Sequence, residues 1–117
     1  MLENISLIKE ANFSMSIKDA QLLAKEFLDK IELSYVGKLR INQCNLFEIF
    51  FVLFIRALMT KDRVVIIKLP YRLLYTLADI KMICQKIEIL NNNKDILILD
   101  TFNNKINYME SICNIIE

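Results

Sequence analysis

The stretch VVIIKLPYRLL, residues 64–74, decides the fold that this sequence predicts. Its first four residues are β-branched and apolar, and a short continuous run of such residues is typical of a strand that is buried on both faces. A second short run, DILILD at residues 95–100, is likewise too apolar for a face exposed to solvent. We therefore predict two buried strands, at about 64–67 and 95–99.

Between the two strands, apolar residues recur every three or four positions, which predicts a long amphipathic helix. They are Leu73, Leu77, Ile80, Ile83, Ile87 and Leu90. The helix should begin near Arg72 and end at the three asparagines of residues 91–93, which favour a loop. Strand, helix and strand together form a βαβ unit, so the strands should be parallel and the crossover right-handed.

The predicted fold class is α/β with a small parallel sheet. The string CNII, residues 113–116, is ambiguous and could add a third strand. Two parallel strands make a poor sheet because their outer edges carry unpaired backbone groups. We therefore expect a third strand, a second copy of the chain or another protein to cover an edge.

The N-terminal half is predicted to be helical. Ser16 and Asp19 have the spacing of a capping pair. The apolar residues that follow at helical spacing are Ala20, Leu23, Phe27 and Ile31. Residues 34–43 predict a loop, and NLFEIFFVLFIRALM, residues 45–59, predicts a buried helix that is shorter than the roughly 20 residues a bilayer requires. With 117 residues, the chain should be one domain, with a helical subdomain at about 1–59 and a βαβ part at about 60–117.

The composition excludes several kinds of chemistry. The chain has no histidine, which rules out Ser-His-Asp and Cys-His catalysis and the usual zinc sites. Gly37 is its one glycine, so it has no P-loop and no dinucleotide fingerprint. A net charge of +1 argues against a nucleic-acid partner. The widely spaced Cys44, Cys84 and Cys113 predict reduced thiols in a cytosolic protein, and we expect no cofactor and no metal.

Several strings, taken in order, resemble the C-terminal half of an ABC transporter nucleotide-binding domain of the lipoprotein-releasing, lipid-trafficking or cell-division type. ENISL at 3–7 resembles the stretch after the glutamine loop, and SIKDAQLLAKEFLDKIEL at 16–33 resembles the helical subdomain. EIFFVLFIRALMTKDRVVIIKLP at 48–70 resembles the helix after the signature sequence and the Walker B strand with its proline. The likeness spans nearly the whole chain, and the part of the family that carries the P-loop would lie before Met1.

The resemblance implies that the family's catalytic positions are altered. The Walker B Asp and Glu fall on Lys68 and Leu69, of which the first would repel magnesium and the second can take no proton. The D-loop Asp falls near Tyr75 and the switch histidine near Thr101. The signature tetrad falls on Cys44, Asn45, Leu46 and Phe47, whereas Glu48 after it still fits the family.

These losses imply a protein that is not an enzyme and has no catalytic residues. The leading hypothesis is a non-catalytic accessory or pseudo-ATPase module for transport or cell division. It would dock onto a membrane permease-type protein or a related ATPase subunit, in the cytoplasm or peripherally at the inner membrane face. The candidate anchors are Phe47, Phe50, Phe51 and Phe54, which could equally pack inside the domain. Heavy use of Ile, Lys and Asn suggests a bacterial source.

Three other interpretations stay open. The first is an ordinary buried strand that ends in a solvated Lys68, with Pro70 in the first turn of the next helix. The second is a self-associating structural protein, a homodimer through the open strand edge or the Phe-rich helix. The third is an enzyme, for which Asp100 is the one carboxylate worth naming because it follows a buried strand, where ligands bind in α/β proteins.

Overall fold

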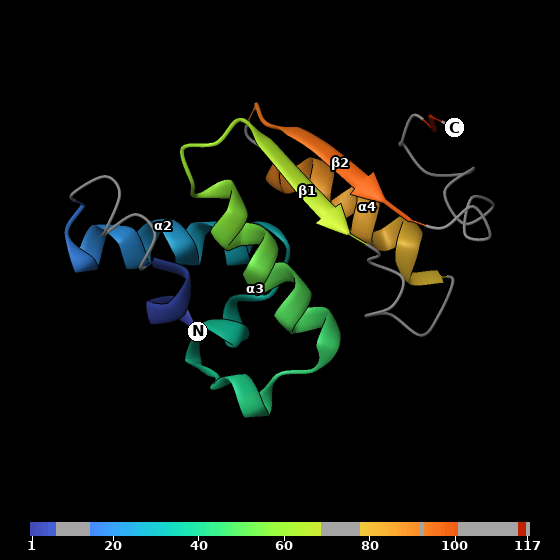
Figure 1. The fold of residues 1–117 in the computed structure, drawn as a ribbon. Coiled ribbons are helices and arrows are strands. Elements are labelled where there is room, and N and C mark those ends of the chain that lie inside the picture. Colours follow the sequence, from blue (N-terminus) through green and yellow to red (C-terminus); the bar gives the residue numbers. More distant parts are fainter. Residues whose placement is uncertain (7–14, 69–77, 92, 101–114, 117) are drawn as a thin grey trace. The chain divides into compact units, whose positions relative to one another are not determined.

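The computed structural model describes residues 1–6, 15–68, 78–91, 93–100 and 115–116 (Figure 1). It is a mixed helix and strand structure with a two-stranded sheet. The chain divides into two compact units, residues 1–63 and 64–117. Each unit is described by itself.

In the first unit, the first long helix is α2, Ile17–Lys30. It begins where the capping pair predicts, because the Ser16 side chain accepts a hydrogen bond from the backbone N–H of Asp19 at 3.1 Å. Its buried residues are Ala20, Ala24, Phe27 and Leu28, and its charged residues are exposed. The amphipathic helix predicted from the spacing is therefore confirmed.

The predicted loop after α2 contains two short 3₁₀ helices, η1 (Ser34–Lys38) and η2 (Ile41–Gln43). Val36 is fully buried and anchors η1. A Cβ at Gly37 would lie 2.9 Å from the Cγ of Leu2, so this close approach requires glycine unless Leu2 moves. The glycine of this loop thus serves packing against the N-terminal residues.

The second long helix, α3 (Leu46–Leu58), confirms the helix predicted from residues 45–59. Asn45 caps its start, and at its end the backbone N–H of Met59 reaches the carbonyls of Ile55 and Arg56. Seven residues of α3 are buried, including the fully buried Phe51. The helix is apolar on most sides, and it is the chief contributor of large side chains to the interior of this unit.

In the second unit, β1 (Val64–Lys68) and β2 (Asp95–Leu99) pair in parallel, and α4 (Ala78–Leu90) connects them. The predicted parallel pairing is confirmed, with Ile66 opposite Leu97. The helix ends at Leu90, and the side chain of the next residue, Asn91, accepts a hydrogen bond from the N–H of Lys94 and donates one to its carbonyl. The predicted start of the helix near Arg72 lies outside the described residues.

The prediction that both faces of the strands are buried is wrong. On one face, Val65 is buried and Ile67, Ile96 and Ile98 are half-buried, and α4 lies on this side (Figure 1). On the other face, four aliphatic side chains are between 46% and 61% exposed. They are Val64, Ile66, Leu97 and Leu99. One helix covers one face of a two-stranded sheet, so the continuous apolar run overstates the burial.

The possible third strand at 113–116 is not seen in its described part. Residues 115 and 116 are exposed and are not in a strand, and residues 113 and 114 lie outside the described residues. Among the described residues, the sheet has two strands, in the order β1-β2.

Truncating a buried ring of α3 should destabilise the protein far more than truncating an exposed leucine two positions later. We expect Phe51→Ala to lower the free energy of unfolding by about 3–5 kcal/mol, because the ring is fully buried. Leu53→Ala, at a half-exposed position, should cost less than about 1 kcal/mol. Urea denaturation followed by circular dichroism measures both, and equal losses would contradict the burial of Phe51.

Candidate functional site

The start of α3 is the first candidate site, because the signature tetrad of the resembled family falls there. The Asn45 side chain accepts from the N–H of Glu48 at 2.8 Å, and the Glu48 carboxylate accepts from the N–H of Asn45 at 2.8 Å. This reciprocal capping box uses N–H groups that an anion at a helix start would need. A buried carboxylate in the same place would also repel a phosphate.

The Glu48 carboxylate influences two neighbouring side chains. Its hydrogen bond with Tyr35 raises the pKa of the phenol, because the phenol must keep its proton to donate. Burial, together with the charge of Glu48, raises the pKa of the Cys44 thiol. The Sγ of Cys44 lies 3.4 Å from the carbonyl of Arg40 and donates to it. Tyr35, Cys44 and Glu48 thus form a small polar cluster in which the thiol is protonated and unreactive.

The cysteine predictions agree with this arrangement where they can be followed. Neither Cys44, which is half-buried, nor Cys84, which is buried, is in a disulfide. Cys113 lies outside the described residues. No sequence pattern signalled the contact between Tyr35 and Glu48, because these two residues are 13 positions apart and belong to different elements, η1 and α3.

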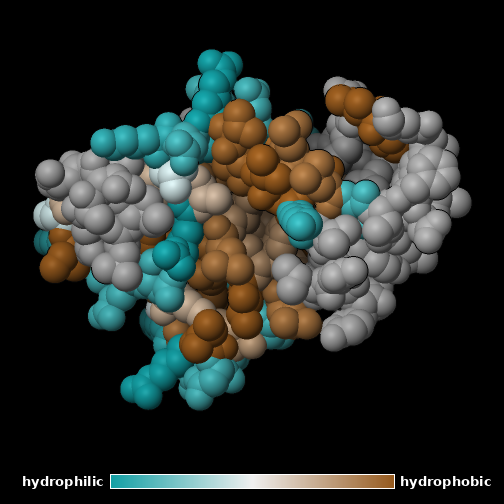
Figure 2. Space-filling model, viewed as in Figure 1, coloured by the Kyte–Doolittle hydropathy of each residue, from teal (hydrophilic) through white to brown (hydrophobic). Residues whose placement is uncertain are grey.

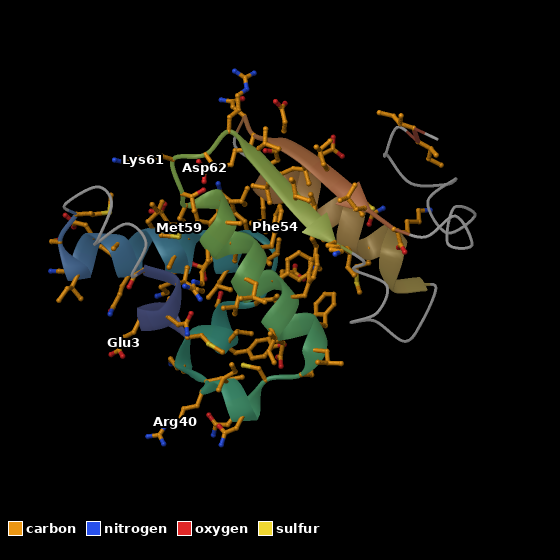
Figure 3. The ribbon with its side chains drawn as sticks, viewed as in Figure 1. Glu3, Arg40, Phe54, Met59, Lys61 and Asp62 are labelled. Carbon is orange, nitrogen blue, oxygen red and sulfur yellow. The ribbon has the colours of Figure 1, made fainter. Side chains whose placement is uncertain are left out.

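The four candidate anchor phenylalanines of α3 contact one another. The ring centroids of Phe47 and Phe51 are 5.0 Å apart, and those of Phe50 and Phe51 are 5.1 Å apart, both edge to face. The rings of Phe50 and Phe54 stack with their centroids 6.4 Å apart, and Phe54 is labelled in Figure 3. Phe50, Phe51 and Phe54 are buried and Phe47 is half-buried, so the rings act here as packing, and their predicted role in partner binding stays a prediction.

The exposed side of α3 carries other apolar residues. Leu46, Ile49 and Leu53 are spaced by three and four positions, and so lie on one face of the helix. Leu46 and Leu53 are exposed and Ile49 is half-buried. In contrast, Arg40 in the preceding loop extends a charged side chain away from the ribbon (Figure 3). We call Leu46, Ile49 and Leu53 the α3 stripe.

The second candidate site is the exposed face of the sheet. In the parallel register, Val64 pairs with Asp95, Ile66 with Leu97 and Lys68 with Leu99, and all six residues belong to one face. Figure 2 shows hydrophobic residues gathered over β1 and β2. Ile66 and Leu97 lie in the middle, with Val64 beside Asp95 at one end and Leu99 beside Lys68 at the other. We call these six residues the sheet face.

Several sequence-predicted positions can now be placed. Lys68, where the resembled family has a metal-binding Asp, is exposed at the end of β1. Cys44, Asn45, Leu46 and Phe47 lie together at the start of α3. Leu69, Tyr75 and Thr101 lie outside the described residues.

A hollow of about 620 Å³ lies between α4 and β2 in the second unit. Apolar residues such as Cys84, Ile87 and Ile98 line it, with Glu88 and Asp95 at its polar part. Asp100, the one carboxylate that could suggest an enzyme, does not line it.

Two absences concern the described part of the chain. Within the ranges given above, no three or more Cys, Asp and Glu residues gather where they could hold a metal ion. The helices in that part of the chain are too short or too polar to cross a bilayer. In comparisons with protein-family models, curated proteins and solved structures, no match to this chain was found.

The Tyr35–Glu48 contact predicts a pH dependence. Since the folded state raises the pKa of Tyr35 above its ordinary value of 10.0, the contact stabilises the fold fully below pH 10 and loses this contribution as the pH rises through the raised pKa. Glu48→Gln keeps an oxygen for the capping box but removes the charge. We expect this variant to lower the pKa of Tyr35, measured by NMR titration of the ring signals with Tyr35→Phe for assignment. An unchanged pKa would contradict the contact.

Proposed function

We propose that this chain is a non-catalytic, ABC-ATPase-like accessory module, a pseudo-ATPase that docks onto a membrane permease-type or division-type partner. The resemblance of strings between residues 3 and 70 to an ABC nucleotide-binding domain suggests the family. The adjacent parallel strands β1 and β2 are compatible with the core of such a domain. The observation that carries the docking role is the α3 stripe, which places apolar side chains on the exposed side of the helix that follows the signature position. In the resembled family, the helical subdomain is the part that contacts the permease.

Two positions at which the resembled family binds Mg²⁺ and phosphate differ here, which supports a non-catalytic role. At the end of β1, the ammonium of Lys68 takes the place of a metal-binding carboxylate, and like charges repel. At the start of α3, Asn45 and Glu48 cap the helix with their own side chains. Neither place is built to hold Mg²⁺ or a γ-phosphate.

The α3 stripe is a plausible anchor on energetic grounds. Covering the exposed half of Leu53 would contribute roughly 1 kcal/mol, and Leu46 a similar amount. A central pair of such contacts with a polar surround is the usual pattern of a modest protein interface. Phe50, Phe51 and Phe54, packed beneath, would hold the helix rigid for this contact. The proposed location is the cytoplasm or the inner face of a bacterial membrane.

Membrane fractionation tests the docking role. The tagged full chain, expressed in bacteria, should sediment with the membrane fraction. After that fraction is extracted with mild detergent, the chain should co-purify with an integral membrane protein. Leu53→Lys should reduce the membrane-bound fraction at least about fivefold, because it places a charge in the apolar contact. Leu22→Lys on α2, where the leucine is equally half-exposed, is the matched control and should have no effect. A chain that stays wholly in the supernatant and alone would overturn the proposal.

Calorimetric titration with Mg-ATP tests the loss of nucleotide chemistry separately. We expect no heat of binding at nucleotide concentrations up to about 1 mM, the upper end of usual KM values. The physical reason is that the cation at Lys68 opposes the metal and that α3 is self-capped. A saturable heat of binding would contradict the pseudo-ATPase proposal and leave the docking result untouched.

A further inference from the structure

The loop between α2 and α3 carries positive charge and no acid of its own. From Ser34 to Phe47 the sequence contains Lys38 and Arg40, both exposed, and neither Asp nor Glu. The side chain of Arg40 extends away from the ribbon (Figure 3). Within the described ranges, neither of these two cations forms an ion pair. The loop therefore presents two long cationic side chains to solvent.

The acids that flank the loop are engaged elsewhere or lie on α2. Glu48, the first acid after the loop, is buried, and its carboxylate accepts hydrogen bonds from the N–H of Asn45 and from the hydroxyl of Tyr35. Before the loop, Asp29 accepts a hydrogen bond from Ser34. Residues 17–33 carry lysines and acids in mixture, whereas the loop carries cations alone. The loop is thus a basic part of the surface of the first unit.

Exposed apolar side chains stand among these cations. Ile41 is 63% exposed and Tyr35 is 54% exposed. Over η2, Figure 2 shows hydrophobic and hydrophilic residues side by side. We call Tyr35, Lys38, Arg40 and Ile41 the loop surface. An exposed isoleucine contributes nothing to the binding of a soluble anion, so the loop surface fits a partner that is both anionic and apolar.

Hydrogen bonds within the loop hold the loop surface in place. The N–H of Arg40 donates to the side-chain oxygen of Gln43 at 2.9 Å, and the carbonyl of Arg40 accepts from the N–H of Gln43 at 2.9 Å. The same carbonyl accepts from the thiol of Cys44 at 3.4 Å. Val36 is fully buried and anchors the other end of the loop. A partner therefore does not have to order this backbone on binding, which lowers the entropic cost of the contact.

We propose that the loop surface binds the headgroup region of an anionic lipid bilayer. Ile41 and the exposed part of the Tyr35 ring lie at the boundary with the acyl chains, and Lys38 and Arg40 reach the lipid phosphates. A bilayer surface offers negative charge directly above an apolar layer, which is the pairing that the loop surface presents. The aliphatic stems of lysine and arginine let their charged ends extend to phosphates while the stems cover apolar surface. Tyrosine favours the same boundary because its ring is amphipathic.

The contact is weak and reversible, because it consists of two cations and little apolar area. A single myristoyl chain leaves half of a protein bound at about 0.1 mM lipid, and the loop surface should require on the order of 1 mM. Such a contact raises the concentration of the chain at a membrane without anchoring it there. It uses neither the family resemblance nor the α3 stripe, so it goes beyond the proposed function and stands independently of it.

Co-sedimentation of the full chain with sucrose-loaded vesicles tests the lipid contact. With about 40% phosphatidylglycerol in phosphatidylcholine at low salt, half of the chain should sediment at about 1 mM accessible lipid. Pure phosphatidylcholine should bind at least about tenfold more weakly, and about 0.5 M salt should release the chain, because both changes remove the attraction of the headgroups. Equal binding to both kinds of vesicle, or no binding at about 5 mM lipid, would overturn the proposal. The vesicles contain no protein, so this result does not depend on a permease-type partner.

Charge reversal tests the role of the cations. Arg40→Glu should weaken binding to the phosphatidylglycerol vesicles at least about tenfold, because it replaces an attraction to the headgroups by a repulsion. Lys25→Glu changes the net charge by the same amount at an exposed position of α2, and should have no effect. With folding checked by circular dichroism, equal losses in the two variants would show that net charge alone drives binding, against the proposal.

An uncharged substitution separates a bilayer from an acidic protein or another soluble anion. Ile41→Ser leaves the net charge unchanged and should weaken binding about fivefold, because it removes the side chain that reaches the apolar layer. Leu22→Ser, at an exposed position of α2, is the matched control and should bind as the wild-type chain does. If Arg40→Glu abolishes binding and Ile41→Ser leaves it unchanged, the loop surface is a site for a soluble anionic partner and the proposal fails.

Discussion

A single helix can cover only one face of a pair of strands, and this constraint governs the second unit. α4 lies against the side of Val65, Ile67, Ile96 and Ile98, and the parallel register then places every alternate residue on the open side. In larger α/β proteins a second helix layer covers that side. Among the described residues of this unit, none does so, and the aliphatic side chains of the sheet face stay exposed.

The first unit solves its packing in another way. α3 is apolar nearly all round, and it divides its residues between an aromatic cluster on the buried side and the α3 stripe on the exposed side. Its start is closed by the side chains of Asn45 and Glu48, and Glu48 also holds Tyr35. These contacts stabilise the start of α3 and occupy backbone N–H groups there that a bound phosphate would otherwise use.

The two surfaces suggest different roles that can coexist in one chain. The α3 stripe is a narrow apolar row of the kind that fits a groove of another protein, whereas the sheet face is a broader aliphatic surface on a hydrogen-bonded strand pair.

The sequence by itself determined the local elements. The Ser16–Asp19 spacing marked the start of α2, and the apolar run of residues 45–59 predicted α3. Two short apolar runs on either side of a helical period predicted a parallel strand pair. These signals depend on neighbouring residues only. Tertiary structure alone decided which face of each element is covered. The same aliphatic pattern is compatible with a strand that is buried on both faces and with one that is buried on a single face. The phenylalanines of α3 could form part of a core or an exposed patch. The Tyr35–Glu48 contact joins elements that are distant in the sequence. Whether a side chain is buried depends on which element packs against it, and the local sequence pattern does not contain that information.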